Sequence, residues 1–570
     1  MIDSVRSNRA VQGILWSLCL AVPLTCTGCG VSTSAATSVS TSGTATTTAL
    51  SPSATTATVG TSITLTATVT PSAAAGTVTF YDSSTSIGAA ALSSGSASLA
   101  TSALTTGTHT VTATYAGSTA YASSTSSGVT ITIDAIASSS SCGLGTAADA
   151  YSSGSTTLAS ASISAANTDE SAVCAQNSGT SVTLTSPAIA TTGNTDSTDN
   201  SSFYGLNAAV LAYGSSASTA TGGAIAITNG TITTSGSGAN GAFASGDGAT
   251  VTISGTTINA TGGNAHALDA AEGGTLKIAN VTATTTGASG SVVATDRGGG
   301  TVTVNGGTYT ASGQRSAGIY STGVITVTNG TFTANDAEAA VVEGSNSIAL
   351  TGTTLVSSGG DDRGVFLYNS TSGDAQAGTG SFSMTNGSLT YTCSAAACSS
   401  GSISSGQNNP ATMFSVANTT ATISLANATI TNNVATLLTA EALNSGTWGT
   451  AGENGGLVTF TASGTALAGD VIVDSISTAT IILASGSSLT GAINNAKTGE
   501  LVGLSLDATS KWTVTGTSYL TTLSDTAGIS GTTVGNIVGN GNTVYYSSAN
   551  NSSLAGLTYT LSGGGYLKPY

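Results

Sequence analysis

Charged side chains are scarce in this chain, and their scarcity excludes several classes of protein. Only 6% of the 570 residues are charged, with 9 Lys and Arg against 25 Asp and Glu, so the net charge is −16. So few basic residues cannot neutralise a phosphate backbone, and we expect no nucleic acid partner. A disordered chain would combine low hydropathy with many charges, whereas the mean hydropathy here is +0.26.

Proline and histidine are also rare. Six prolines, with no glycine at every third position, exclude a collagen triple helix. The two histidines, His109 and His266, lie in different parts of the chain and leave no Ser/His/Asp set. Neither a Gly-rich phosphate loop nor a GGxGxD calcium repeat occurs, so we expect no cofactor and no metal site. The abundant Gly, Ser, Thr and Ala predict an all-β protein, with no helix beyond the leader.

The first 29 residues predict export. A basic start and an apolar core over residues 10–24 form a signal peptide, and this core is too short for a membrane span. The sequence TGC at 27–29 resembles the end of a bacterial lipobox, although Cys26 stands where that family prefers Leu. The resemblance implies a lipid on Cys29 and contact with the membrane through that lipid alone. Plain secretion is the alternative.

Four further cysteines fall into two near pairs. An even number of cysteines in an exported protein predicts disulfides, and no histidine lies near either pair to favour metal ligation. We expect the bonds Cys142–Cys174 and Cys393–Cys398.

The N-terminal part predicts a spacer and a sandwich. Residues 30–50 are almost entirely Ser, Thr, Ala and Gly and are predicted to form a flexible linker. Alternation then appears in SITLTATV, GTVTFYD, HTVTATYAG and VTITI, which predicts the short strands of a β-sandwich. Through VGTSITLTATVTP, GTVTFYD and GTHTVTATYAGSTAYASSTS, residues 51–134 resemble the bacterial immunoglobulin-like domain, group 3. The resemblance implies a spacer on an exported protein, with residues 135–141 as a second linker.

A Thr-rich sequence motif recurs after this module, as in AITNGTITTSG, TVTISGTTINATGG and GTVTVNGGTYTASG. Each copy has an apolar anchor. Asn or Gly follows two positions later, and a second apolar residue follows five positions later, with Ala283 as a small exception. Because Asn and Gly tolerate a left-handed backbone, the chain is predicted to bend there. The anchors are Ile227, Ile253, Ile278, Val304, Val327, Leu350, Met384 and Leu425.

A single repeat of roughly 25 residues cannot bury its apolar residues alone. Each buried Ile or Leu gains about 1.5–3 kcal/mol, while ordering each residue costs about 1–2 kcal/mol. Stacked repeats share one core, which predicts a long, single-stranded, right-handed parallel β-helix over residues 142–570. Cys142–Cys174 would close one end, and a cap with Trp512, Tyr519 and Tyr545 would close the other. A second inward strip is predicted at Phe243, Leu268, Val293, Ile319, Val342 and Phe366.

From about Cys142 the chain resembles bacterial surface β-helix proteins, including the passenger regions of autotransporter adhesins. The matching pieces are GTVTVNGGTYTASG, GIYSTGVITVTNGT and LSLDATSKWTVTGTSYL. The resemblance implies adhesion to a glycan or protein on another cell or on a matrix. No membrane-barrel pattern follows the repeats, so a lipid anchor or free secretion is expected instead of the autotransporter route.

Threonine stands four positions after most anchors. Stacking would place these residues in an outward column with neighbours about 4.8 Å apart. Such an array suits ice binding, although stacked Thr also simply suits a sheet. Spacings of 34 and 41 residues between later anchors are expected to interrupt the plane. The candidate ladder is Thr231, Thr257, Thr282, Thr308, Thr331 and Thr354.

Charge is concentrated in residues 247–374, which hold 14 of the 34 charged residues. Several follow the second apolar strip by one to four residues, so stacking would gather them on one side of the β-helix. His266, beside Asp269, could join them. The candidate contact face is Asp269, Asp296, Arg297, Tyr320, Glu343, Asp362, Arg363 and Tyr368.

Three functions remain open on the sequence alone. Adhesion or structural display by an exported, lipid-anchored surface protein is favoured, without catalytic residues. Carboxylates, arginine and aromatic residues on one face are also typical of polysaccharide lyases and hydrolases. Against catalysis, the charges could pair with sequence neighbours, Asp296 with Arg297 and Asp362 with Arg363. Ice binding by the Thr ladder is the third hypothesis.

Overall fold

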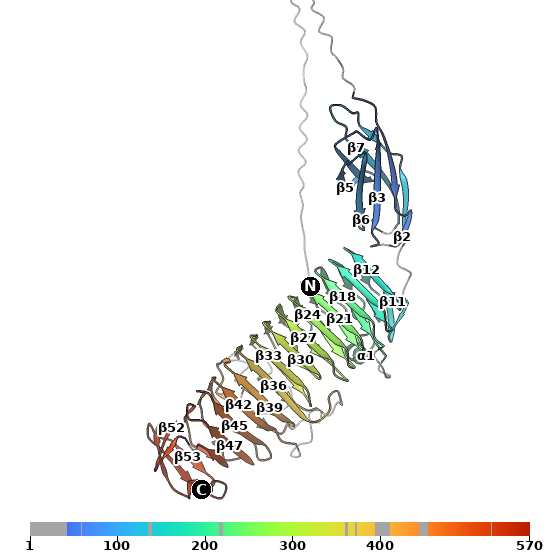
Figure 1. The fold of residues 1–570 in the computed structure, drawn as a ribbon. Helices are drawn as coiled ribbons and strands as arrows, with labels where there is room; N and C mark the ends of the chain where they lie inside the picture. The colour runs from blue at the N-terminus through green and yellow to red at the C-terminus, as the bar shows by residue number, and fades with distance from the viewer. Residues whose placement is uncertain are drawn as a thin grey trace, which may run out of the picture.

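The computed structural model describes residues 43–58, 60–105, 107–134, 140–215, 221–358, 363–370, 373–393, 411–443, 454–525 and 527–570. The predicted signal peptide, Cys29, Asp362 and Cys398 lie outside these ranges. The described chain is all-β, with an immunoglobulin-like sandwich followed by a long parallel β-helix (Figure 1). Within the described ranges, no helix has the length and apolar character that crossing a bilayer requires.

Two sheets form the N-terminal sandwich. The first contains β1 (Thr47–Pro52), β3 (Ile63–Thr70) and β6 (Ser96–Thr101). The second contains β2 (Thr56–Thr58), β9 (Val129–Asp134), β7 (Gly107–Tyr115), β4 (Thr77–Asp82), β5 (Thr85–Ala91) and β8 (Ser124–Thr125). Alternate residues of β3 are buried, as the sequence predicts. The module begins earlier than predicted, because β1 pairs with β3 inside the expected linker and Thr44 bridges Tyr121.

Most coils of the β-helix add one strand to each of three sheets, and the last coils add none to the covered sheet, which ends at β44. The covered sheet contains β10 (Ser140–Cys142), β11 (Gly145–Tyr151), β14 (Glu170–Gln176), β17 (Val210–Tyr213), β20 (Ala242–Ser245), β23 (Leu268–Ala271), β26 (Val293–Thr295), β29 (Ile319–Ser321), β32 (Ala340–Glu343), β35 (Arg363–Tyr368), β38 (Thr412–Ala417), β41 (Thr436–Glu441) and β44 (Asp470–Val473). The middle sheet contains β12 (Ser155–Ala159), β15 (Ser181–Thr185), β18 (Ala224–Thr228), β21 (Thr250–Ser254), β24 (Thr275–Ala279), β27 (Thr301–Asn305), β30 (Val324–Thr328), β33 (Ser347–Thr351), β36 (Thr379–Thr385), β39 (Thr420–Ala426), β42 (Leu457–Ser463), β45 (Thr478–Ala484), β47 (Leu501–Leu506) and β50 (Thr522–Ser524).

The third sheet, called the threonine sheet here, contains β13 (Ser162–Ala165), β16 (Ala188–Thr191), β19 (Thr231–Thr234), β22 (Thr257–Ala260), β25 (Thr282–Thr285), β28 (Thr308–Ala311), β31 (Thr331–Ala334), β34 (Thr354–Ser357), β37 (Ser388–Tyr391), β40 (Thr429–Asn432), β43 (Ala466–Ala468), β46 (Ser488–Thr490), β48 (Lys511–Thr513), β49 (Ser518–Leu520), β51 (Ile529–Ser530), β52 (Thr533–Val538), β53 (Thr543–Tyr546), β54 (Tyr559–Ser562) and β55 (Tyr566–Pro569). A short 3-10 helix, η1 (Ser552–Leu554), lies near its end.

The predicted anchors form one buried column on the middle sheet. Ile227 pairs with Ile253, Ile253 with Ile278, and the register continues without a slip to Leu425. Ile253 is fully buried, and the apolar cluster that contains it extends from Leu158 to Leu567. Stacking therefore gives the repeats the shared core that the sequence predicts.

The predicted bends are confirmed. All eight Asn and Gly residues two positions after the anchors have positive φ, from 50° at Asn280 to 71° at Gly306. Asn and Gly adopt this left-handed conformation more easily than other residues. The bend connects the middle sheet to the threonine sheet in each coil.

Replacing Asn329 by valine should lower the free energy of unfolding by about 1–3 kcal/mol, because a β-branched residue is strained at a φ of 57°. Urea unfolding followed by circular dichroism measures the change. The matched control is Asn329→Gly, since glycine occupies the same place in neighbouring coils and should be tolerated. Equal stability of the two variants would contradict the assigned bend.

Two residues of the predicted second inward strip do not face the core of the β-helix. Phe243 and Phe366 do not join the central column; they pack in two smaller clusters on the outer side of this sheet. Strands β20, β23, β32, β35, β38 and β41 are buried at every residue. Because both faces are covered, apolar residues appear on both, and alternation cannot identify the inward one.

A helix that the sequence pattern did not predict lies against this outer side. Helix α1 (Thr198–Tyr204), labelled in Figure 1, contacts β23. The Ser197 side chain accepts a hydrogen bond from the backbone N–H of Asn200 at its start, and Gly205 ends it in the left-handed conformation. Its length of seven residues explains why no helical periodicity is visible.

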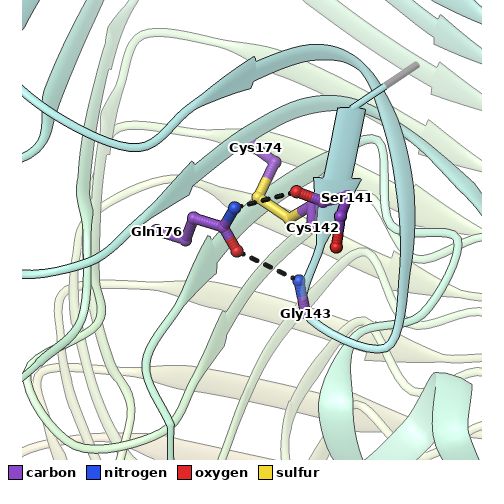
Figure 2. Close-up of a disulfide and its surroundings, with 5 residues drawn as sticks. All are labelled: Ser141, Cys142, Gly143, Cys174 and Gln176. Carbon is purple, nitrogen blue, oxygen red and sulfur yellow. Dashed lines mark hydrogen bonds between the residues drawn. A yellow bond between two sulfur atoms is a disulfide. The ribbon is translucent and has the colours of Figure 1, made fainter.

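Both ends of the β-helix are closed. At the N-terminal end, β10 and β11 form an antiparallel hairpin, and Cys142 is bonded to Cys174, as predicted (Figure 2). At the other end, antiparallel pairs β51–β52 and β54–β55 finish the threonine sheet. Tyr519 stacks on Tyr545 there, with ring centroids 5.0 Å apart. Trp512 is fully buried in the core, and its strand β48 pairs with β52, one of the closing strands. Cys393 is also disulfide-bonded.

Replacing Cys142 and Cys174 together by alanine should lower the free energy of unfolding by about 3–4 kcal/mol. The bond joins residues 32 positions apart and so restricts the unfolded chain. Unfolding of the first coils, followed by hydrogen exchange of β11 and β14, measures the loss. Unchanged protection in the double variant would show that the hairpin is held by packing alone.

Candidate functional site

The predicted contact face follows the outer side of the covered sheet. Asp269 lies in β23, Tyr320 in β29, Glu343 at the end of β32, and Arg363 and Tyr368 in β35. Asp296 and Arg297 directly follow β26. Parallel stacking thus gathers side chains that are up to 99 residues apart (368 minus 269). The predicted gathering on one side is present for every described member.

Most of the gathered side chains are buried, however. Exposure is 0% for Asp269, 7% for Asp296, 2% for Glu343, 7% for Arg363 and 5% for Tyr368. Arg297 reaches solvent, with 39% of its side chain exposed, and Tyr320 is half-buried. The candidate contact face is therefore largely a buried layer of polar side chains, and Arg297 is its main solvent-exposed member.

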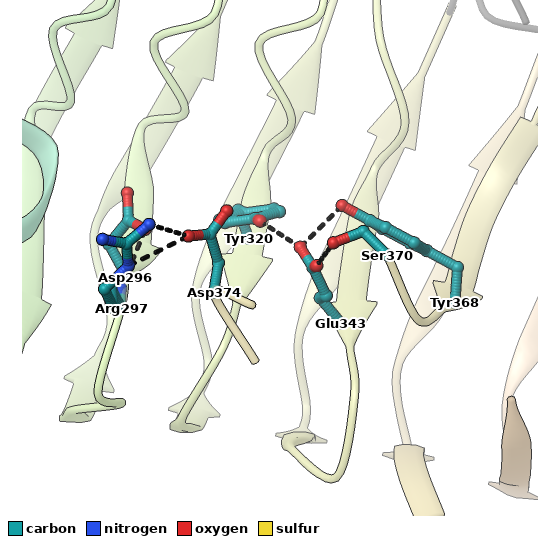
Figure 3. A network of polar contacts seen from close by, with 7 residues as sticks. All are labelled: Asp296, Arg297, Tyr320, Glu343, Tyr368, Ser370 and Asp374. Carbon is teal, nitrogen blue, oxygen red and sulfur yellow. Dashed lines mark hydrogen bonds and ion pairs between the residues drawn. The ribbon is translucent and has the colours of Figure 1, made fainter. Parts of the chain in front are cut away.

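Glu343 is the centre of one polar network (Figure 3). Tyr320 donates its hydroxyl to Oε2 of Glu343 at 2.5 Å, and Tyr368 donates to the same oxygen at 2.7 Å. Ser370 donates to the other carboxylate oxygen. Burial raises the pKa of both tyrosines well above the ordinary value, and the nearby carboxylate adds to the shift. The tyrosines therefore remain protonated and donate their hydroxyl hydrogens to the Glu343 side chain.

Arg297 forms the second arrangement. Its Nη2 lies 2.7 Å from Oδ1 of Asp374, and its Nε lies 3.1 Å from the same atom (Figure 3). Its guanidinium also stacks on the Phe203 ring of α1, 3.7 Å from the ring centroid. The predicted side-chain pair with Asp296 is wrong, because Asp296 accepts from the Arg297 backbone N–H instead. A polar recess of about 340 Å³ opens beside this pair. It is lined by Arg297, Thr322, Ser345, Asn346, Asp374 and Gln376, among others.

Arg363 is held inside the layer. Its Nη1 lies 3.7 Å from Oε1 of Glu338, and its guanidinium lies 4.2 Å from the Phe366 ring centroid. Nearby, burial raises the pKa of Glu441 to about 6, partly opposed by the charge of Arg363. Burial and these contacts hold the Arg363 side chain inside the protein.

The third group could hold a metal ion. His266, Asp269 and Asp296 offer ligand atoms that all lie within 4.8 Å of one another. Burial raises the pKa of both carboxyl groups, to about 8 for Asp296, and lowers the pKa of His266 to about 4. The sequence predicted that stacking would gather Asp269 and Asp296 on one side with His266 beside them, but it did not indicate that their ligand atoms would come this close.

The threonine column is also present. Thr231, Thr257, Thr282, Thr308, Thr331 and Thr354 are direct register partners on adjacent strands. The column continues through Ser388 to Thr429, so the expected interruption is wrong. In the 34-residue spacing the longest interval between strands separates β35 from β36, and in the 41-residue spacing it separates β37 from β38, so neither interrupts a strand of the threonine sheet. The side chains are exposed, with Thr354 half-buried.

Comparison with known proteins identifies one part of the chain. Residues 50–134 match the family model for the bacterial immunoglobulin-like domain, group 3, which agrees with the sandwich described above. No curated protein and no solved structure matches the chain.

Proposed function

We propose that this chain is an exported bacterial surface protein whose β-helix serves as a rigid rod for display and adhesion, attached to the membrane by a lipid on Cys29. The observation that carries the proposal is the single apolar core from Leu158 to Leu567, which makes the repeats one rigid body. The immunoglobulin-like module between the leader and the rod supports a spacer role. Exchange of Cys29 for serine should move the protein from the membrane fraction to the medium.

The recess beside Arg297 is the proposed contact point for a glycan or protein ligand. It combines an exposed guanidinium with the amide side chains of Asn346 and Gln376, and such groups bind hydroxyl and carboxylate oxygens. Most other charged members of the strip are buried and cannot reach a partner.

Attachment of cells that display the chain tests this proposal. Binding to a glycan array and to matrix-coated surfaces should fall about tenfold or more on Arg297→Ala, because loss of a charged interface contact typically costs about 2 kcal/mol or more. Arg315→Ala is the matched control, since Arg315 is exposed on another turn. If both variants attach equally well, the recess is not the contact point. If the wild-type chain does not attach at all, the proposed adhesive function is wrong.

Ice binding by the threonine sheet is the second candidate, because the in-register column is a specific observation that favours it. Repeated hydroxyl and methyl groups about 4.8 Å apart form a regular, nearly uncharged face. Thermal hysteresis should be lost in Thr308→Tyr and retained in Thr303→Tyr, which adds the same bulk to the middle sheet. Absence of hysteresis in the wild-type chain would reject this candidate.

Polysaccharide cleavage is supported less well. A two-carboxylate mechanism requires both groups to reach the glycosidic bond, whereas Asp269 and Glu343 are buried.

A further inference from the structure

Two successive coils bring three ligand-type side chains together beneath the surface. His266 precedes β23, Asp269 lies within it, and Asp296 follows β26, the next strand of the covered sheet. Their ligand atoms lie within 4.8 Å of one another, and their exposures are 7%, 0% and 7%. Two ligands of one ion lie at most about 4.4 Å apart, twice a metal–ligand bond of about 2.0–2.2 Å, so a small side-chain adjustment would let these three atoms share an ion.

Asp269 supplies a second, independent observation. Both of its carboxylate oxygens are buried, and neither accepts a hydrogen bond of ordinary geometry from any residue that the structure describes. The ion pairs among the described residues involve neither Asp269 nor Asp296, and the nearby Arg297 side chain is directed to Asp374 and Phe203. A buried carboxyl group without a partner is costly, so the position requires either a proton or a cation.

His266 is held in place by two hydrogen-bonding contacts. Its Nδ1 lies 3.2 Å from the carbonyl oxygen of Ser291, and its backbone N–H donates to Oδ1 of Asn240 at 2.7 Å. When Nδ1 carries the proton and donates it to Ser291, the lone pair of Nε2 is free. Metal-bound histidines commonly show this arrangement, with the second ring nitrogen bonded to a carbonyl.

We propose that His266, Asp269 and Asp296 bind one divalent transition-metal ion of the Zn²⁺ or Mn²⁺ class. One neutral imidazole and two carboxylates balance a double positive charge. The nitrogen ligand favours such ions over Ca²⁺, which takes six to eight oxygen ligands. The ion would join two adjacent coils at the buried layer of the covered sheet. This inference is independent of the adhesive function.

Sharing of a proton between Asp269 and Asp296 is the competing explanation for the two buried carboxyl groups. The two explanations differ in metal content. If the two carboxyl groups share a proton, the site holds no ion. The variant Asp269→Asn would then keep the contact with Asp296 and leave the metal content of the protein unchanged.

The first test measures metal in the full-length chain, produced without an affinity tag in medium supplemented with Zn²⁺ or Mn²⁺. Mass spectrometry of the purified protein should find about one ion per chain, lost in Asp269→Asn. Asp149→Asn is the matched control, because Asp149 is also a buried acid but lies outside the cluster. Wild-type protein with no ion, or with the same content as Asp269→Asn, would overturn the proposal.

The second test does not depend on the folding of an Asp269 variant. The chain has two histidines, so His109→Gln leaves His266 as the single imidazole. Pulsed electron paramagnetic resonance of this variant loaded with Cu²⁺ should show coupling to an imidazole nitrogen. Loaded protein without that coupling would show that any bound ion lies elsewhere, and the proposed site would be rejected.

Discussion

Replacement of Ile253 by aspartate is expected to lower the free energy of unfolding by at least about 4 kcal/mol, or to prevent folding of the surrounding coils. Ile253 is fully buried between Ile227 and Ile278 in the anchor column. A carboxyl group there would lose its water without gaining a partner, and it would also leave the volume of the isoleucine side chain partly empty.

Thr252→Asp is the matched control, because Thr252 is the preceding residue of β21 and is exposed. Its partner on β24 is Lys277, so a new carboxylate there has a favourable neighbour. Urea unfolding followed by circular dichroism should separate the two variants clearly. Similar stability of Ile253→Asp and Thr252→Asp would show that Ile253 does not face a dry core.

The second large effect is the pH dependence of stability caused by Asp149, an acidic residue in a column of inward-facing side chains. On the covered sheet Asp149 aligns with Val173, Val210, Ala242 and Leu268 on successive strands. Asp149 is 3% exposed, and burial raises its pKa to about 7. Between about pH 4 and pH 7 the folded chain therefore binds more protons than the unfolded chain. Asp149 therefore contributes about 4 kcal/mol to the free energy of unfolding at low pH. This contribution is fully present below pH 4 and is lost as the pH rises through 7.

The pH profile of Asp149→Asn tests this expectation. Other buried acids titrate as well, for example Glu441 with a pKa raised to about 6, so the informative quantity is the difference between variant and wild type. We expect the variant to gain stability relative to wild type between pH 4 and pH 8. Parallel profiles would contradict the burial of Asp149 in the column.

The anchors and bends were predictable because their signals are local. An apolar residue followed two positions later by Asn or Gly defines both the inward face and the left-handed turn, and the same pair recurs in the eight coils that carry the anchors. The covered sheet carries no such signal. Its strands are buried on both faces, so Phe243 and Leu268 look equivalent in the sequence although they point to opposite sides.

The contacts of the charged strip could not be predicted for a different reason. Stacking explains why Asp269 and Asp296 lie on one side, but Asp374 reaches Arg297 from 77 residues away through a segment outside the repeat. Phe203 belongs to a short helix that precedes the repeated sequence motif. Such contacts depend on how individual insertions fold over the sheet, and each insertion is unique.

The stacking register itself can be measured with pairs of spin labels on the threonine sheet. Thr429 lies two coils from Thr354, four from Thr308 and six from Thr257 in the register. With cysteines at these positions, and with Cys19, Cys26 and Cys29 replaced by serine, double electron–electron resonance should give backbone separations of about 10, 19 and 29 Å. A constant increase of about 4.8 Å per coil is the predicted result. Separations that do not increase in proportion to the number of coils would contradict the parallel β-helix.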